Sequence, residues 1–322
     1  MSEYIQVERV QALLPDRFID AYLGCNRPVI VTDAMSQWSA LRNWTPAYFR
    51  RRFGDEIVQI YDDLFFMVST RPLKDYIDRF ITGPRTAGKA GAKAPYVRWY
   101  SRQDAREDFP WSDSVFARLQ DEWSRPYFMP ERGMYLPFAK GEEVRDPVSA
   151  QFPARGIFIS AQGARTRLHV DPWASDALLC QVNGVKRFLL FPPNAVPMLT
   201  HDGALVDIRY DAGTDDWVEL PVRPYADDCL HPGEIIFIPA GWAHTFQSTN
   251  PSISITWNFV HRTNAARLAD YVETGVPQSE ARSFAYFFGA AGMAELLGEK
   301  QERDYRGADG SPDTSGTPPP SP

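Results

Sequence analysis

The segment between residues 156 and 260 contains a series of short apolar runs that follow one another without an intervening helical pattern. These runs cover residues 156–160, 166–171, 177–182, 185–191, 233–239 and 252–260. Asn183-Gly184 joins the third run to the fourth, and this dipeptide is typical of a two-residue hairpin turn because both residues tolerate a positive φ. Strands at this spacing predict an antiparallel β-sandwich or barrel.

The residues before this β region mix helical and strand patterns. Residues 15–23 carry apolar side chains at helical spacing, and residues 28–32 form a short β-branched run. Thr45 followed by Pro46 is typical of a helix N-terminus, and we expect this helix to run to about Phe53. The sequence therefore predicts an N-terminal α/β lead-in to the β region.

Composition and pattern together divide the chain into parts. We expect an α/β lead-in over 1–95, a β core over 96–261, helices over 262–306 and a disordered tail over 307–322. The helical patterns within the third part cover residues 265–272 and 279–297. Residues 83–95, rich in Gly, Ala, Lys and Pro, predict a surface loop that serves as a linker rather than as a flap over a site. The aromatic and proline-rich segment 96–138 is expected to form an irregular layer on the core.

The overall composition is that of a globular protein. Of 322 residues, 44% are apolar and 23% are charged, which excludes a wholly disordered or collagen-like chain. No apolar run approaches the ~18 residues of a membrane span. The three cysteines form no CxxC pair, so neither a disulfide framework nor a cysteine zinc site is indicated. The acidic N-terminus predicts a cytoplasmic protein, and the net charge of -7 disfavours nucleic acid as a partner.

Ligand-type side chains stand at the end of the second apolar run. Residues two apart on a strand point to the same face, so His169 and Asp171 are predicted to project together. Pro172 cannot extend the ladder, which places the pair at a strand end, where a barrel opens to a cavity. His244, shortly after the run 233–239, supplies a third ligand. Two imidazoles and one carboxylate make the facial triad that is typical of non-haem iron(II) oxygenases.

Three segments together resemble the Jumonji-C domain of the cupin-like hydroxylase type. They are His169-Val170-Asp171-Pro172, the segment 184–193 and the segment 232–244. Residues 27–31 also resemble the N-terminal region of that family, and the similarity extends over most of residues 10–275. Within the family, the spacing and the dipeptide Asn258-Phe259 most resemble the protein hydroxylases once described as arginine demethylases.

The resemblance implies a mainly β double-stranded β-helix, that is, a cupin or jelly-roll barrel. It also implies iron(II) bound by His169, Asp171 and His244, with 2-oxoglutarate and O2 as co-substrates. By family position, Lys186 supplies the cation for the distal carboxylate of 2-oxoglutarate, since an ammonium group neutralises a desolvated carboxylate well. The alternative for Lys186 is a solvated side chain beside a turn.

Further polar side chains are candidates for contacts with the co-substrate. Thr166 stands at the family position of a hydroxyl that helps to hold the same carboxylate. Strict alternation places Thr166 on the opposite face from His169, so this role requires a β-bulge or a local twist. In the run 252–260, Thr256 and Asn258 belong to a polar stripe that faces either solvent or a wet cavity. The resemblance favours the cavity, with both residues as secondary contacts.

The resulting expectation is an Fe(II)- and 2-oxoglutarate-dependent dioxygenase. It would hydroxylate a C–H bond of a protein, a peptide or a small molecule and release succinate and CO2. One alternative is a non-oxidative cupin enzyme with zinc or manganese in the same ligands, for which Lys186 has no evident use. Another is a pseudo-enzyme that uses the barrel to bind proteins. Apolar residues in 279–297 would pack on the barrel or form a homodimer interface.

Overall fold

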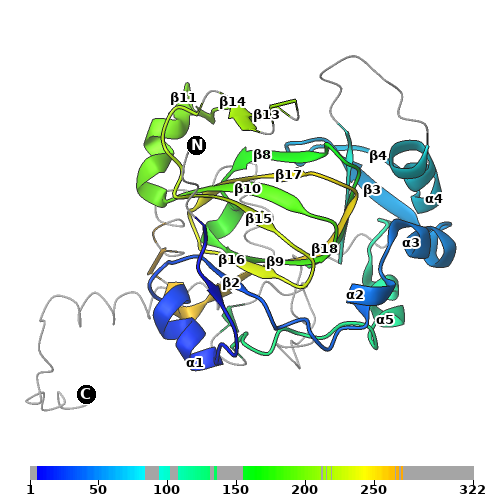
Figure 1. Ribbon diagram of the computed structural model, residues 1–322, viewed down its shortest axis with the longest axis horizontal. Coiled ribbons are helices and arrows are strands. Elements are labelled where there is room, and N and C mark those ends of the chain that lie inside the picture. The colour runs from blue at the N-terminus through cyan, green and yellow to red at the C-terminus, as the bar shows by residue number, and fades with distance from the viewer. Residues whose placement is uncertain are drawn as a thin grey trace, which may run out of the picture.

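A computed structural model describes most of the chain between residues 6 and 267 (Figure 1). The described residues are 6–83, 94–101, 108–130, 134–135, 155–211, 213–214, 216–218, 220–264, 266–267 and 270. The helix expected over 279–297, the homodimer interface expected there and the tail 307–322 lie outside them. Most of the segments 265–272 and 83–95 also lie outside, so these expectations stay predictions.

The larger of two facing sheets runs across the whole molecule. Within the described residues it has the strand order β1-β2-β16-β9-β18-β7-β5-β3-β4, with β6 paired to β18. The strands are β1 (Arg9–Val10), β2 (Val29–Val31), β3 (Ile57–Tyr61), β4 (Met67–Pro72), β5 (Tyr96–Tyr100), β6 (Met134–Tyr135), β7 (Gly156–Ser160), β9 (Asp176–Asn183), β16 (Ile235–Ile238) and β18 (Ser252–His261). Only β1 and β2 pair in parallel among these described strands. Strands of the lead-in therefore extend the sheet of the β core at both edges.

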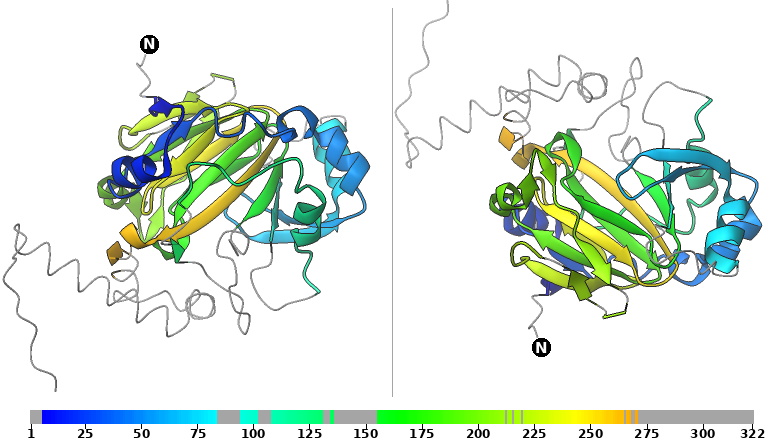
Figure 2. Two further views of the ribbon diagram at one scale, coloured as in Figure 1. Left: turned by 90° about the horizontal axis from the view of Figure 1, so that it is seen from below. Right: turned by 90° about the horizontal axis from the view of Figure 1, so that it is seen from above.

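The smaller sheet closes the barrel. Its order is β15-β10-β17-β8, antiparallel throughout. The strands are β8 (Arg165–His169), β10 (Lys186–Phe191), β15 (Ala226–Leu230) and β17 (Ala243–Ser248). Buried side chains from both sheets meet between them, among them Leu179, Ile236 and Ile238 from the larger sheet and Phe188, Leu190 and Phe246 from the smaller. This arrangement, visible from two sides in Figure 2, is the predicted cupin or jelly-roll fold.

Helices pack on the larger sheet and at one of its ends. They are α1 (Pro15–Phe18) continuing into the π-helical turn η1 (Ile19–Leu23), α2 (Ala40–Asn43), α3 (Pro46–Phe53), α4 (Leu73–Ile77) continuing into the π-helical turn η2 (Asp78–Thr82), and α5 (Asp113–Arg118). The ring of Phe18 lies 4.8 Å from that of Phe237. Thr45 caps α3 as predicted, because its Oγ1 accepts the backbone N–H of Tyr48 at 3.1 Å. α3 and α4 lie beside β3 and β4, at the opposite end of the molecule from α1 (Figures 1 and 2). In the part of the chain that is described, no helix has the length and apolarity to cross a membrane.

The predicted hairpin at Asn183-Gly184 is wrong. β9 pairs with β16 and β18, whereas β10 pairs with β15 and β17, so the dipeptide carries the chain from one sheet to the other. Of the two residues only Gly184 has a positive φ, of 76°. A Cβ on Gly184 would meet the carbonyl oxygen of Pro251 at 2.2 Å. The glycine is therefore required by a close crossing of two backbone segments, not by a type I′ turn.

The segment between β10 and β16 adds a layer outside the smaller sheet. It contains the 3-10 helix η4 (Pro193–Leu199) and the short strands β11 (Thr200–His201), β12 (Ala204–Leu205), β13 (Arg209–Asp211) and β14 (Asp216–Val218). Its last part is β15, a strand of the barrel that was not predicted from the sequence. Asp227 and Asp228 interrupt its apolar pattern, yet both are largely buried, and each pairs with an arginine.

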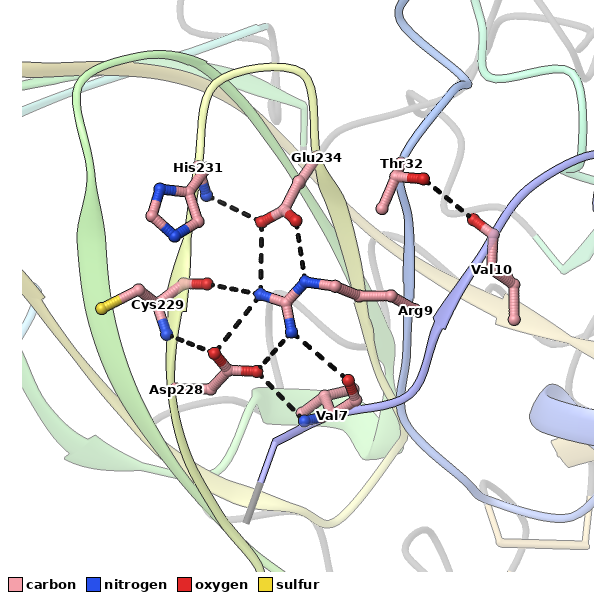
Figure 3. Close-up of polar contacts among 8 residues, drawn as sticks. All are labelled: Val7, Arg9, Val10, Thr32, Asp228, Cys229, His231 and Glu234. Atoms are coloured by element: carbon pink, nitrogen blue, oxygen red, sulfur yellow. Dashed lines mark hydrogen bonds and ion pairs between the residues drawn. The ribbon is translucent and has the colours of Figure 1, made fainter. Parts of the chain in front are cut away.

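One arginine ties the N-terminal strand to the barrel. Figure 3 shows the guanidinium of Arg9 between the carboxylates of Asp228 and Glu234. Arg9 Nη1 donates to Asp228 Oδ2 at 2.7 Å, and Nε donates to Glu234 Oε1 at 2.8 Å. Nη2 also donates to the carbonyl oxygen of Cys229 at 2.8 Å. Since the two acidic side chains are only 6% and 12% exposed, loss of the cation would leave buried negative charge unpaired.

Candidate metal centre

The three predicted ligands meet at one end of the barrel. His169 ends β8 and lies opposite His244 in the neighbouring strand β17. His169 Nε2 is 3.7 Å from Asp171 Oδ1, and His244 Nε2 is 3.9 Å from Asp171 Oδ2. The three candidate ligand atoms all lie within 4.8 Å of one another. An ion with metal–ligand distances of about 2.1 Å can contact all three after small side-chain adjustments.

Backbone carbonyls decide which nitrogen of each imidazole faces the centre. Nδ1 of His169 lies 2.8 Å from the carbonyl oxygen of Arg167, and Nδ1 of His244 lies 3.0 Å from that of Trp242. Because a carbonyl only accepts, each Nδ1 carries the proton and each Nε2 presents a lone pair. Burial, reinforced by the neighbouring His244, holds the pKa of His169 well below its usual value. The imidazole is therefore neutral, the form that binds metal.

The carboxylate of Asp171 lies two residues beyond the end of β8. The strand expected over 166–171 is shorter in the structure, because β8 ends at His169 and Pro172 begins the 3-10 helix η3 (Pro172–Ala174). Burial raises the pKa of Asp171, and the nearby His244 and Asn258 partly offset this effect. A cation between the ligands would favour the ionised carboxylate.

A cavity leads from the three ligands into the barrel. Its lining contains all the site residues predicted from the sequence, namely His169, Asp171, His244, Lys186, Thr166, Thr256 and Asn258. Rings from several strands complete the wall, among them Tyr96, Tyr100, Phe158 and Phe246. The cavity thus combines an apolar wall with a few convergent polar groups, which is typical of a small-molecule site.

Lys186 is a buried cation and not a solvated one. Its residue is only 1% exposed. Nζ donates to the hydroxyl of Tyr96 at 2.5 Å and to Oγ of Ser254 at 3.0 Å. Among the described residues, none of the hydrogen-bond partners of Nζ is a carboxylate. A desolvated ammonium group with two neutral partners can still donate a hydrogen bond to an anionic partner.

Thr166 lines the same cavity because β8 carries a bulge. His169 pairs with His244, and Thr166 pairs with Phe246, so a three-residue step on β8 matches a two-residue step on β17. The extra residue reverses the alternation and brings Thr166 to the face of His169. The carbonyl oxygen of Thr166 accepts from Oγ1 of Thr245 at 2.8 Å, which holds the bulge in place.

The polar stripe of β18 faces the interior. Ser254 is fully buried and contacts Lys186, and Thr256 is 9% exposed. Thr256 and Asn258 both line the cavity. Asn258 Nδ2 also donates to Oγ of Ser175 at 3.4 Å. The solvent-facing alternative for this stripe is therefore wrong.

Three residues beside the cavity were not identified from the sequence. Tyr96 and Arg98 lie on β5, a strand within the segment that was expected to be irregular. Phe65 lies in the turn between β3 and β4 with a φ of 65°, and its ring centroid is 4.8 Å from that of His169. The alternation of Tyr96, Arg98 and Tyr100 with Val97 and Trp99 has a period of two, which is the signal that predicts the strand.

Comparison with known proteins agrees with this geometry. A family model described as a cupin-like domain matches residues 15–265. The chain belongs to the cupin-like domain family. The match covers most of the lead-in as well as the barrel, whose strands form one sheet.

Similar proteins carry names from the Jumonji-C group, which confirms the resemblance predicted from the sequence. Arginine-specific demethylase JMJ22 of Arabidopsis thaliana is 25% identical over 287 residues, covering 83% of this chain and 48% of that protein. Human bifunctional peptidase and (3S)-lysyl hydroxylase JMJD7 is 24% identical, covering 76% and 80% respectively. Human 2-oxoglutarate and iron-dependent oxygenase JMJD4 is 24% identical, covering 80% and 61%. The chain thus spans about half the length of the Arabidopsis relative.

Proposed function

We propose that this chain is an Fe(II)- and 2-oxoglutarate-dependent dioxygenase that hydroxylates a C–H bond of a protein or peptide side chain. The observation that carries the proposal is the presence, in one cavity, of a 2-His-1-carboxylate triad and a buried lysine that has no carboxylate partner among the described residues. The names of two similar proteins, an iron-dependent oxygenase and a lysyl hydroxylase, support this reaction class.

The donor set fits iron(II). Two neutral imidazole nitrogens and one carboxylate oxygen suit this ion and leave one face of an octahedron open for a co-substrate. When bound, iron supplies the oxygen chemistry, with succinate and CO2 as the co-products of 2-oxoglutarate. The backbone carbonyls behind His169 and His244 fix the tautomer of each ring, so the ligands are oriented before the ion arrives.

The remaining polar residues suit a dicarboxylate co-substrate. Lys186 offers an ammonium group to the distal carboxylate, and Thr166 offers a hydroxyl on the same cavity wall. Thr256 and Asn258 offer further hydrogen bonds from β18. The aromatic rings around them exclude water, which strengthens each electrostatic contact. A non-oxidative cupin reaction has no evident use for the buried lysine.

The rim of the cavity supports a polypeptide substrate. Phe65 lines the cavity, and the residues that follow it, Phe66, Met67 and Val68, are 68%, 47% and 58% exposed. Met67 and Val68 begin β4, an edge strand of the larger sheet among the described residues. An extended peptide can pair with such an edge and rest apolar side chains on such a patch.

The test is an untargeted screen of peptides for a mass gain of one oxygen that depends on both Fe(II) and 2-oxoglutarate. Formation of succinate from 2-oxoglutarate is measured in parallel. His169→Ala and Asp171→Ala should abolish both signals, while His201→Ala, which alters a histidine with an 81% exposed side chain, should leave them unchanged. Turnover that survives loss of His169, or a zinc-loaded protein that does not bind 2-oxoglutarate, would favour a different activity.

A further inference from the structure

Arg98 is a fully buried arginine that the sites described so far do not use. It lies on β5 at 0% exposure. Nη1 donates to the carbonyl oxygen of Asp62 at 2.8 Å, and Nη2 donates to Oγ1 of Thr166 at 3.0 Å. Its Cζ lies 4.0 Å from the ring centroid of Phe65 and 4.9 Å from that of Tyr96. Both rings belong to the wall of the cavity.

The charge of Arg98 lacks a carboxylate partner within the described residues. Its hydrogen bonds there go to a backbone carbonyl and a hydroxyl, and Nε has no partner. Burying a cation without an opposing charge costs several kcal/mol. By comparison, Arg187, also largely buried, pairs with Asp227 through two bonds of 2.9 Å. The fold thus holds a buried guanidinium without a hydrogen-bonded carboxylate directly behind the wall of the candidate active site.

The contact with Thr166 determines where the threonine proton points. A guanidinium group has only donors, so Oγ1 of Thr166 is the acceptor in this hydrogen bond. The hydroxyl therefore keeps its own proton for a different acceptor. Thr166 faces the cavity, and its backbone is held by Thr245. The proton is consequently available to an acceptor inside the cavity.

We infer that Arg98 is a positioning residue for the co-substrate, acting through Thr166. By donating to Oγ1 it directs the threonine proton towards the carboxylate that Lys186 binds. Its positive charge also increases the electrostatic attraction of that end of the cavity for an anion. This inference rests on the proposed function, because it assumes a co-substrate with a second carboxylate. The consequence is selectivity for a dicarboxylic 2-oxo acid over a chelator that lacks the distal carboxylate.

The inference is tested by a double-mutant cycle on the binding of two probes. The dissociation constants of 2-oxoglutarate and of oxalate are measured calorimetrically on the Mn(II)-loaded protein. Oxalate chelates the metal but has no distal carboxylate to reach Lys186. Arg98→Met should weaken the affinity for 2-oxoglutarate by roughly ten-fold or more, the size of one lost charge-supported hydrogen bond. The affinity for oxalate should stay within about two-fold of that of wild type. Because Arg98 acts in part through Thr166, Arg98→Met should cost less affinity for 2-oxoglutarate in the Thr166→Val background than in wild type.

Several outcomes would overturn the inference. One is an unchanged affinity for 2-oxoglutarate in Arg98→Met. Another is fully additive losses in the double variant, and a third is an equal loss for oxalate. If Arg98→Met does not fold, Arg98→Gln carries the same cycle, since it keeps an N–H donor and loses the charge. It should bind 2-oxoglutarate more weakly than wild type. A wild-type protein that does not bind 2-oxoglutarate would refute the proposed function, whereas equal binding by wild type and both Arg98 variants would refute only the role of Arg98.

Discussion

Replacing Lys186 by methionine should change stability and binding in opposite directions. Lys186→Met keeps the length of the side chain and removes a buried charge that has only the hydroxyls of Tyr96 and Ser254 as hydrogen-bond partners in the described structure. Replacing a buried ion pair by apolar groups of similar volume is often neutral or stabilises a protein by about 1–4 kcal/mol, and Lys186 lacks even the opposing charge of such a pair among the described residues. The free energy of unfolding of the metal-free variant should therefore equal or exceed that of wild type.

The affinity for 2-oxoglutarate should fall strongly in the same variant. Removing one partner of a buried charge pair costs about 2–5 kcal/mol, which corresponds to a loss of affinity between roughly 30-fold and several thousand-fold. Stability is measured by urea denaturation, and affinity by calorimetry on the Mn(II)-loaded protein. Lys74→Met is the matched control, because among the described residues Lys74 forms an exposed ion pair with Asp55. This variant should alter neither quantity by more than about 1 kcal/mol.

The opposite result would refute this role of Lys186. In that case the Lys186→Met protein would be destabilised by more than about 2 kcal/mol and would bind 2-oxoglutarate as tightly as wild type. It would mean that the ammonium group serves the fold and not the ligand.

Three further predictions concern the fold. Burial raises the pKa of Asp176 to about 7, so the folded state holds this proton more tightly than the unfolded state. This contribution to the free energy of unfolding is complete at low pH and is lost as the pH rises towards 7, at up to about 1.4 kcal/mol per pH unit. Asp176→Asn should remove this pH dependence from urea denaturation curves recorded between pH 4.5 and 7.5. Arg9→Met should lower the free energy of unfolding in urea by about 2 kcal/mol or more, whereas Arg27→Met, which breaks an exposed pair, should cost at most about 1 kcal/mol; equal effects would contradict the role of burial. Gly184→Ala should lower the melting temperature more than Gly163→Ala, since both glycines have a positive φ but only Gly184 lies against backbone; equal shifts would contradict the close crossing.

The metal ligands were predictable because their spacing follows local rules. A period of two predicts His169 and Asp171 on one face near a strand end, whatever the partner strand is. The structure brings both to one centre, although β8 already ends at His169. The polar alternation of β18 was equally visible, although the sequence alone left open whether Thr256 faced solvent or a cavity. Only the position of β18 inside the barrel decides this.

Features that depend on pairing between distant strands were not predictable. Asn183-Gly184 has the local chemistry of a hairpin, but β9 and β10 each find two other neighbours. The bulge that turns Thr166 into the cavity is defined by the register of β8 against β17. Arg98 shows the same limit, since its inferred role depends on a hydrogen bond to Thr166, which lies 68 residues away in the sequence.

The most direct test of the central claim is the stoichiometry and affinity of metal binding at His169, Asp171 and His244. Metal-free protein is titrated with Mn(II) and the free ion is followed by electron paramagnetic resonance. We expect one tightly bound ion per chain in wild type and in the control His231→Ala, and no stoichiometric binding in His169→Ala, Asp171→Ala or His244→Ala. A single tight ion that persists in all three ligand variants, or no bound ion in wild type, would contradict the assignment of this centre.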